Sequence, residues 1–227
     1  MSPEKLVILP FNTELGRARL EALGRRIITS FGNYYNSMEV LEPRTATPED
    51  FPDPSSEIDY LSDSWEVIAE KELKRVFAKD IVLGTYTTLN GNPEQGIYRI
   101  LADEFGPTHT LVITDMLINY GGQRAGGVAN KKLGKVTATT YNIYRDSNPK
   151  DNDELERRLA GVARHELGHI FGLEHHDVLL SGGEYCPLTN KSWNDPEFET
   201  PDRVAAYLDS RSDRFCSDCT GAINFFK

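Results

Sequence analysis

The sequence predicts an α/β fold, in which helices pack against a β-sheet, and three features support this prediction. Residues 5–10 and 37–43 are short apolar segments typical of strands, and 15–31 between them has apolar residues at helical spacing. In residues 135–144, side-chain character alternates from one residue to the next, as in a strand. Residues 147–172 carry the most convincing helical pattern. Because a strand, a helix and a strand follow one another near the N-terminus, we expect a parallel pair of strands with a helical crossover.

The middle of the chain is predicted to alternate between loops and helices before it returns to the sheet. Residues 44–56 are rich in Pro, Asp, Ser and Thr and predict a loop, and 86–95 predict a turn-rich break. Helices are expected at 62–80 and at 93–106. The apolar segment 109–118 predicts a further strand.

The glycine-rich segment 121–130 allows two interpretations. A phosphate-binding loop would be followed by a Lys with Ser or Thr and by a helix, whereas here a strand follows. We therefore predict a turn followed by an edge strand.

Composition and charge describe an ordinary globular protein. The formal net charge is -10 and the pI is near 5.0, which argues against a nucleic-acid binder and against docking on anionic lipid. No run of about 18 apolar residues occurs, and the first residues lack the apolar core of a signal peptide. We therefore expect a cytoplasmic protein without a membrane span.

The predicted helix in 147–172 has a start signal and an apolar stripe. Asp151, Asn152 or Asp153 can cap its N-terminus. Apolar residues at steps of three and four should face the core; they are Leu155, Leu159, Ala163, Leu167 and Ile170.

Four of the five histidines lie within twelve residues at the end of this helix. His165 and His169 are four apart, so they project from one face with Cβ atoms about 5–6 Å apart and can share one zinc ion. Glu166 lies next to them, and Gly172 is placed to end the helix so that His175 can return as a third ligand. The full pattern is HExxHxxGxxH, the signature of the metzincin zinc peptidases.

Three histidine ligands predict a catalytic zinc rather than a structural one, because they leave a fourth position for water. Zinc lowers the pKa of that water from 15.7 to about 7, and Glu166 can accept its proton as general base. Two other interpretations remain: a helix with solvated histidines and a salt-bridged Glu166, and a zinc site that has lost its activity.

The fourth histidine and the three cysteines form a second candidate set. His176 follows His175 directly, so it should point away from the first zinc. Together with Cys186, Cys216 and Cys219 it makes the Cys₃His donor set typical of structural zinc. An odd cysteine count without an export signal makes a disulfide framework unexpected. The alternative for the CxxC pair Cys216/Cys219 is a redox or idle pair.

These motifs resemble those of the archaemetzincins, whose pattern continues as HExxHxxGxxHC, a second Cys in Cys-x-Met, and CxxC. Here His176 takes the place of the first cysteine, and Cys186 follows after nine residues where the family usually has four. Leu188 takes the place of the methionine that packs beneath the zinc ligands in the family. The specific matches cover about residues 165–219.

The resemblance implies a metzincin-like α/β fold, with a twisted mixed β-sheet, an active-site helix and a short zinc-bound C-terminal subdomain. Residues 1–227 would form one catalytic domain, divided at about 1–172 and 173–227. It also implies a zinc metallopeptidase with two zinc ions per chain, one catalytic and one structural. The alternative is a catalytically inactive zinc protein that binds peptides or partners.

The expected partner is a peptide or protein substrate, which would lie extended and antiparallel along the edge strand. The candidate substrate-binding residues are Gly126, Gly127, Val128 and Ala129. No nucleic-acid or membrane partner is expected, and we expect a monomer.

Overall fold

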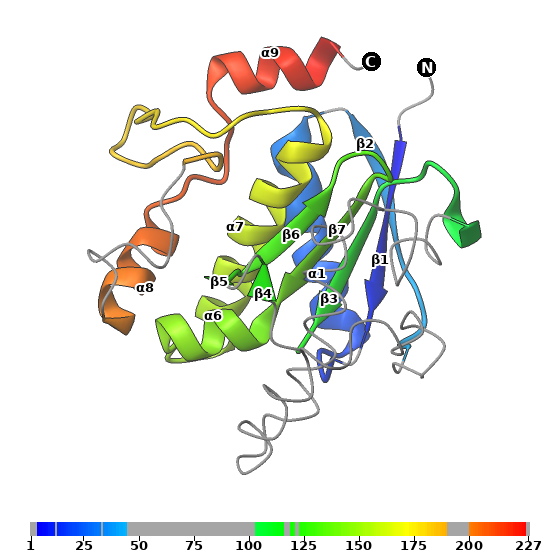
Figure 1. The fold of residues 1–227 in the computed structure, drawn as a ribbon, viewed down its shortest axis with the longest axis horizontal. Coiled ribbons are helices and arrows are strands. Elements are labelled where there is room, and N and C mark those ends of the chain that lie inside the picture. The colour runs from blue at the N-terminus through cyan, green and yellow to red at the C-terminus, as the bar shows by residue number, and fades with distance from the viewer. Residues whose placement is uncertain are drawn as a thin grey trace, which may run out of the picture.

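The computed structural model describes seven stretches of the chain, which contain the sheet and the helices around it (Figure 1). They are residues 4–11, 13–32, 34–44, 103–115, 119–120, 123–189 and 200–225. The five-stranded sheet has the order β2-β1-β3-β7-β6. Its first four strands are mutually parallel and β6 is antiparallel, so the sheet is mixed.

The N-terminal part has the predicted parallel crossover. Strands β1 (Glu4–Pro10) and β2 (Tyr35–Val40) pair in parallel, and α1 (Arg17–Ile28) connects them, followed by the short 3-10 helix η1 (Thr29–Phe31). The crossover buries the apolar face of α1 against the sheet, because Leu20, Leu23 and Ile27 are almost fully buried.

The centre of the sheet is made of β3 (Thr110–Thr114) and β7 (Lys135–Thr139), whose residues are all buried. Strand β6 (Gly127–Asn130) follows β7 at the edge of the sheet. Two shorter strands, β4 (Asn119–Tyr120) and β5 (Gln123–Arg124), pair separately. The edge strand predicted within 121–130 is therefore β6.

The prediction of one strand over 135–144 was wrong in its second half, because Thr140–Ser147 forms the helix α6. The hydroxyl of Thr139 accepts a hydrogen bond from the N–H of Tyr141 and caps the new helix. Thr140, Ile143 and Ser147 are buried at steps of three and four, so this short stretch satisfies a helical pattern as well as an alternating one. The strand predicted at 109–118 likewise ends at Thr114.

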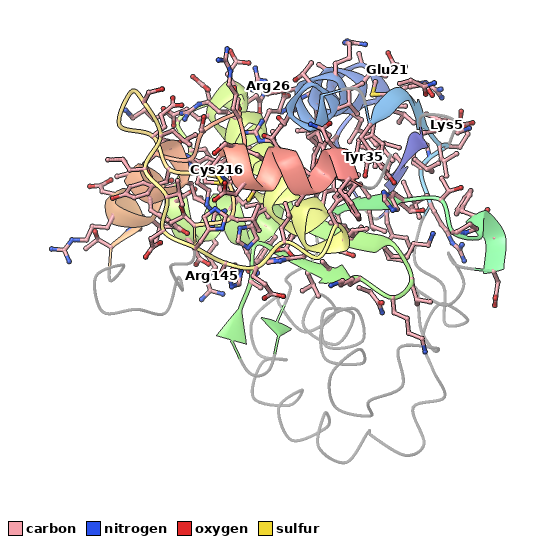
Figure 2. All side chains as sticks on the ribbon, turned by 90° about the horizontal axis from the view of Figure 1, so that it is seen from above. Lys5, Glu21, Arg26, Tyr35, Arg145 and Cys216 are labelled. Carbon is pink, nitrogen blue, oxygen red and sulfur yellow. The ribbon has the colours of Figure 1, made fainter. Side chains whose placement is uncertain are left out.

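The helix α7 (Asn152–Ile170) lies beside α1 against one face of the sheet (Figure 1). Its predicted stripe faces the core: Leu159, Ala163, Leu167 and Ile170 are buried and Leu155 packs against them. Beyond it, α8 (Pro201–Asp209) contacts α6 and α7. The helix α9 (Ser217–Phe225) lies over the C-terminal end of α7, with Cys216 just before its first residue (Figure 2).

Several predicted elements fall outside the described residues. They are the helix at 62–80, the break at 86–95 and all but the first residue of the loop at 44–56. Of the segment 93–106, in which a helix was predicted, residues 103–106 are described, and 103–105 are helical. Within the described part, no helix combines the length and the apolar character that a membrane span requires.

Candidate active site

The helix α7 carries the first half of the candidate site, and hydrogen bonds fix both of its ends. Oδ1 of Asp151 accepts from the N–H of Glu154 at 2.9 Å and caps the N-terminus. At the other end, Gly172 has a φ of 73° and its N–H donates to the carbonyl of His169 at 2.9 Å. This left-handed cap, which glycine adopts without steric cost, ends the helix and turns the chain back toward it.

The three histidines of the motif meet through their Nε2 atoms. Nε2 of His169 lies 3.2 Å from that of His165 and 3.1 Å from that of His175, and the third pair is 3.1 Å apart. The structure therefore brings together the three side chains whose spacing predicted convergence.

Hydrogen bonds on the far side of two of the rings decide which nitrogen carries the proton. Nδ1 of His165 lies 2.8 Å from the carbonyl oxygen of Pro187, and Nδ1 of His169 lies 2.8 Å from that of Leu173. Because a carbonyl only accepts, each Nδ1 carries the hydrogen and each Nε2 presents a lone pair. Burial lowers the pKa of all three imidazoles, which favours their neutral forms. The two lone pairs on Nε2 of His165 and His169 therefore converge, and a cation between them would relieve their repulsion.

Zinc fits this triangle of nitrogens. Two nitrogens about 2.0–2.1 Å from one tetrahedral zinc lie about 3.3 Å apart, close to the distances found here. The Nδ1–H donations to backbone carbonyls are those that metal-bound histidines make. Within the described stretches, no fourth His, Cys, Asp or Glu belongs to this group. The donor set therefore matches a site with one position left for water or substrate.

Glu166 faces the edge strand. A Cβ atom on Gly127 would lie 2.6 Å from Cγ of Glu166, so the glutamate side chain passes directly against the glycine. Burial raises the pKa of the Glu166 carboxyl to about 8, and the nearby charge of Arg211 opposes part of this effect. A carboxylate with a raised pKa is a better proton acceptor near neutral pH.

A tight turn at 186–189 brings the chain back to α7. The N–H of Thr189 donates to the carbonyl of Cys186 at 2.9 Å, and the carbonyl of Pro187 inside the turn accepts from His165. The turn therefore orients one of the three imidazoles.

Leu188, in the same turn, takes the position of the methionine expected from the family pattern. It is fully buried, and its Cδ2 would lie 2.8 Å from a Cβ on Gly168 of α7. The leucine thus fills the space next to the helical turn that separates His165 from His169.

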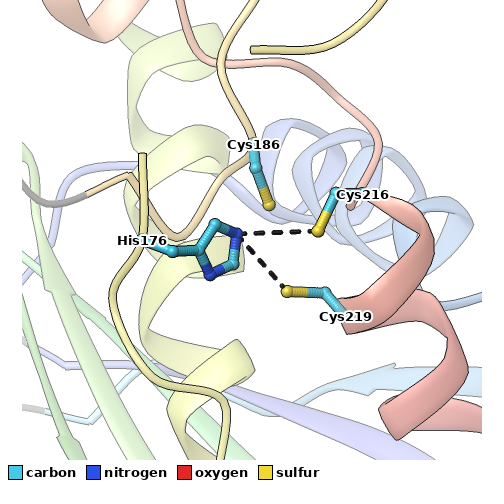
Figure 3. A group of neighbouring side chains, drawn as sticks. All are labelled: His176, Cys186, Cys216 and Cys219. Atoms are coloured by element: carbon cyan, nitrogen blue, oxygen red, sulfur yellow. Dashed lines mark hydrogen bonds between the residues drawn. The ribbon is translucent and has the colours of Figure 1, made fainter. Parts of the chain in front are cut away.

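The second predicted set also comes together (Figure 3). One ligand atom from each of His176, Cys186, Cys216 and Cys219 lies within 4.8 Å of the others. Nε2 of His176 is 3.6 Å from Sγ of Cys216 and 3.6 Å from Sγ of Cys219. His176 therefore belongs to this group and not to the histidine triangle.

Zinc also fits the Cys₃His set. A nitrogen about 2.0–2.1 Å and a sulfur about 2.3 Å from one tetrahedral zinc lie about 3.5 Å apart, close to the two N–S distances found. A hydrogen bond from Cys219, with others from backbone and His176, lowers the pKa of Cys186 to about 5. The thiolate that this favours raises the pKa of Cys219. All three cysteines are free and buried.

The edge strand β6 offers backbone groups on its outer side. The N–H of Thr139 donates to the carbonyl of Gly126 at 2.9 Å, and pairing alternates along an antiparallel ladder. Val128 therefore faces β7, whereas Gly127 and Ala129 direct their N–H and C=O groups away from it.

Arg211 is a residue that the motif analysis missed. Its Nη2 donates to the carbonyl of Thr189 at 3.4 Å, in the turn that orients His165, so it lies beside the site. Its positive charge contributes to the lowered pKa of His165, His169 and His175 and counteracts the raised pKa of Glu166. No motif contains it, and a basic residue shortly before Cys216 is the only signal that the sequence offers.

Comparisons with known proteins give one partial match in sequence. Over 51 residues the chain is 41% identical to the archaemetzincin of Pyrococcus abyssi, a match that covers 22% of this chain and 27% of that relative. No family model matches the chain.

Solved structures share the fold over nearly the whole chain. The zinc-dependent peptidase of Methanocorpusculum labreanum has a TM-score of 0.56 at 15% identity, with 96% of this chain and 100% of that chain covered. The archaemetzincin of Archaeoglobus fulgidus, solved with malonate, has a TM-score of 0.55 at 15% identity, with 96% of this chain and 99% of that chain covered. The archaemetzincin of Methanopyrus kandleri has a TM-score of 0.54 at 16% identity, with 98% of this chain and 94% of that chain covered. The chain therefore has the archaemetzincin fold, and the predicted fold class and resemblance are confirmed.

Proposed function

We propose that the chain is a zinc metallopeptidase that hydrolyses peptide bonds with Glu166 as general base. The observation that carries this proposal is the convergence of three imidazoles through Nε2, two of them on the helix that carries Glu166 next to His165. His165, His169 and His175 would hold the catalytic zinc through those nitrogens. The archaemetzincin fold and the partial match to a curated archaemetzincin support the same activity.

The protein's own groups account for orientation and proton transfer. When bound, zinc would polarise the scissile carbonyl and lower the pKa of water from 15.7 to about 7. Glu166 accepts a proton from the attacking water and passes it to the nitrogen of the departing amine. The carbonyl of Pro187 keeps the His165 ring in the tautomer that presents Nε2.

The substrate in this proposal is an extended peptide that lies antiparallel along β6. It would face Gly127, Val128 and Ala129 of this strand and Gly126 directly before it. The outward N–H and C=O groups of Gly127 and Ala129 would pair with the peptide backbone. Because Gly127 also contacts Glu166, such a peptide would lie next to the general base.

The second zinc in this proposal is structural. His176, Cys186, Cys216 and Cys219 would enclose it with four protein ligands, which leaves no position for substrate. It would connect the chain after Gly172 to the start of α9. In this way it would stabilise the C-terminal subdomain, 173–227, which with the N-terminal subdomain, 1–172, makes up one catalytic domain.

The test compares the wild type with Glu166→Gln on a mixed peptide pool, with cleavage read by mass spectrometry and zinc content by elemental analysis. We expect the variant to keep its zinc and to lose about 100-fold or more of its activity, the usual effect of removing a general base. Glu184→Gln, which changes an exposed glutamate in the loop before Cys186, should behave like the wild type.

Equal inactivity of the wild type and Glu166→Gln, with zinc bound to both, would favour the other function. The chain would then be a zinc protein that binds peptides or partners without cleaving them. Equal activity of the two proteins would show that another group accepts the proton.

A further inference from the structure

The backbone around Arg211 is fixed to the turn that orients His165. The N–H of Tyr185 donates to the carbonyl of Ser210 at 2.8 Å, and the N–H of Ser212 donates to the carbonyl of Tyr185 at 2.7 Å. Arg211 therefore lies beside the segment that begins at Tyr185 and includes Pro187, the acceptor for the His165 ring.

The guanidinium of Arg211 contacts neutral groups. Its Nη2 donates to the hydroxyl of Tyr207 at 2.7 Å and to the carbonyl of Thr189 at 3.4 Å, and its Cζ lies 4.7 Å from the centre of the Tyr207 ring. Its Nε is buried without a hydrogen-bond partner among the described residues. The side chain is thus held in place by groups that do not neutralise its charge.

Two other arginines of the same region show how a buried charge is normally compensated. Arg158 forms a salt bridge with Asp209 at 2.9 Å, and Arg164 forms one with Asp213 at 2.6 Å. Arg211 forms no salt bridge with any residue of the described stretches, although the chain carries a formal net charge of -10. A partly buried guanidinium without a carboxylate is an unfavourable arrangement unless a ligand supplies the negative charge.

The position of this charge relates it to the reaction. The turn that Arg211 contacts through Thr189 is the one that supplies the Pro187 carbonyl to His165. The charge also acts on Glu166 and on each of the three imidazoles. A negatively charged group bound to Arg211 would therefore lie on the side of the site where the turn at 186–189 meets His165.

We propose that Arg211 binds a carboxylate of the substrate close to the scissile bond and makes the site selective for acidic peptides. This inference rests on the proposed peptidase function. The carboxylate would belong to an Asp or Glu side chain or to a free peptide C-terminus, since a planar guanidinium binds both in the same way. Arg211 would act in binding and selectivity and would take no part in the proton transfer.

The experiment measures binding rather than turnover, so it does not depend on catalysis. Zinc-loaded full-length Glu166→Gln protein is titrated with fluorescent peptides in two matched pairs, and Kd is read by anisotropy. One pair differs by Asp against Asn within the sequence, and the other by a free C-terminal acid against its amide. In one pair, we expect the acidic peptide to bind at least about 10-fold more tightly than the neutral one. The pair that shows this difference identifies the source of the carboxylate.

The variant Glu166→Gln/Arg211→Gln should lose this preference and bind the neutral peptides as before. Tyr207→Phe in the same background is the matched control: it removes the hydroxyl that Arg211 contacts but keeps the guanidinium, so the preference should remain. Zinc content and thermal unfolding are recorded for each variant, so that a protein that has not folded is recognised. Arg211→Lys, which keeps the charge without the planar fork, serves as a milder second variant and should retain part of the preference.

Three results would overturn the inference: no preference in either pair, no binding of any peptide, or a preference that survives in folded Arg211→Gln. An internal carboxylate that already neutralises Arg211 would give the first result. If the acid preference depends on Arg211 and yet the wild type cleaves nothing, the carboxylate site stands and the peptidase proposal fails.

Discussion

Gly127 and Glu166 are in direct contact, since a Cβ on the glycine would lie 2.6 Å from Cγ of the glutamate. The edge strand and the metal-binding helix therefore meet at the carboxylate of the HExxH motif. The backbone carbonyl oxygen of Thr137 would be 2.8 Å from the same Cβ, and Cγ1 of Val162 would be 2.9 Å from it. An added methyl group has no free direction, so it must displace either the strand or the glutamate.

Gly127→Ala should therefore reduce turnover while the three histidines keep their zinc. Overpacking of this kind costs about 1–3 kcal/mol, and we expect kcat to fall by about 10- to 100-fold because the general base is displaced. Steady-state kinetics and zinc content measure the two effects. Gly16→Ala, where a Cβ would meet nothing within 4 Å, is the control and should change neither. Unchanged kcat in Gly127→Ala would mean that the position of Glu166 is not set by the strand.

Ala129→Pro tests whether the substrate pairs with the outer side of β6. Ala129 directs its N–H away from β7, so proline removes a donor to the substrate and leaves the ladder with β7 paired. We expect kcat/KM to fall by about 10-fold, mainly through KM, since one backbone hydrogen bond contributes about 1 kcal/mol and the fixed φ adds to the effect. Ala129→Ser, which keeps the N–H, should cleave like the wild type. Equal kinetics for the proline and serine variants would place the substrate elsewhere.

The two clusters should bind zinc independently. We expect two zinc ions in the wild type, with His169→Ala losing one and Cys219→Ser losing the other, because each removes a ligand atom from a different group. Elemental analysis of purified variants gives the stoichiometry, and thermal unfolding shows the larger loss of stability in Cys219→Ser. A wild type with one zinc that persists in Cys219→Ser would leave the cysteines as a redox or idle pair.

Much of the candidate site could be predicted because its geometry is local. Steps of four residues on a helix and a glycine that ends it are enough to bring His165, His169 and His175 together, and they do so with Nε2 atoms 3.1–3.2 Å apart. The parallel strand pair at the N-terminus was predictable for the same reason, because the two strands and the helix between them follow one another directly in the sequence.

What could not be predicted depends on contacts between distant parts of the chain. Residues 140–144 fit both a strand and a helix, and the cap at Thr139 and packing against α8 decide for the helix. Arg211 is held beside the turn at 186–189 by the backbone hydrogen bonds that Ser210 and Ser212 make with Tyr185. Nothing in the spacing of the sequence indicates that pairing.

Leu188 should tolerate methionine, although the family pattern has methionine at that position. The leucine is fully buried against Gly168, and a swap of similar volume usually costs less than about 1.5 kcal/mol. Leu188→Ala, in contrast, leaves a cavity beside the metal-binding helix and should cost about 2–5 kcal/mol. Chemical denaturation of the zinc-loaded proteins measures both. A stability of Leu188→Ala equal to that of the wild type would mean that the turn closes over the gap.

The salt bridge between Arg158 and Asp209 should stabilise the contact between α7 and α8 in a pH-dependent way. Arg158 is almost fully buried, donates Nε and Nη2 to the two carboxylate oxygens at 2.9 Å each, and also donates Nη1 to the carbonyl of Ser147. Burial alone would raise the pKa of Asp209, but hydrogen bonds from Arg158 and Arg157 outweigh it, so this pKa lies below its usual value. Asp209→Asn leaves the buried arginine with the more distant carboxylate of Glu154, 3.5 Å from Nη2, and should cost about 3 kcal/mol at pH 7.

The pH dependence of that loss follows from the lowered pKa. Below about pH 3.9 the unfolded chain binds a proton at Asp209 that the folded chain still excludes, so stability falls as the pH decreases toward the folded value. The difference in unfolding free energy between the wild type and Asp209→Asn should therefore be constant above about pH 5 and shrink below about pH 4. Denaturation at several pH values measures this difference, which cancels the effect of zinc release because both proteins carry the same metal ligands. A difference that stays constant into acid would mean that the carboxylate acts through packing and not through its charge.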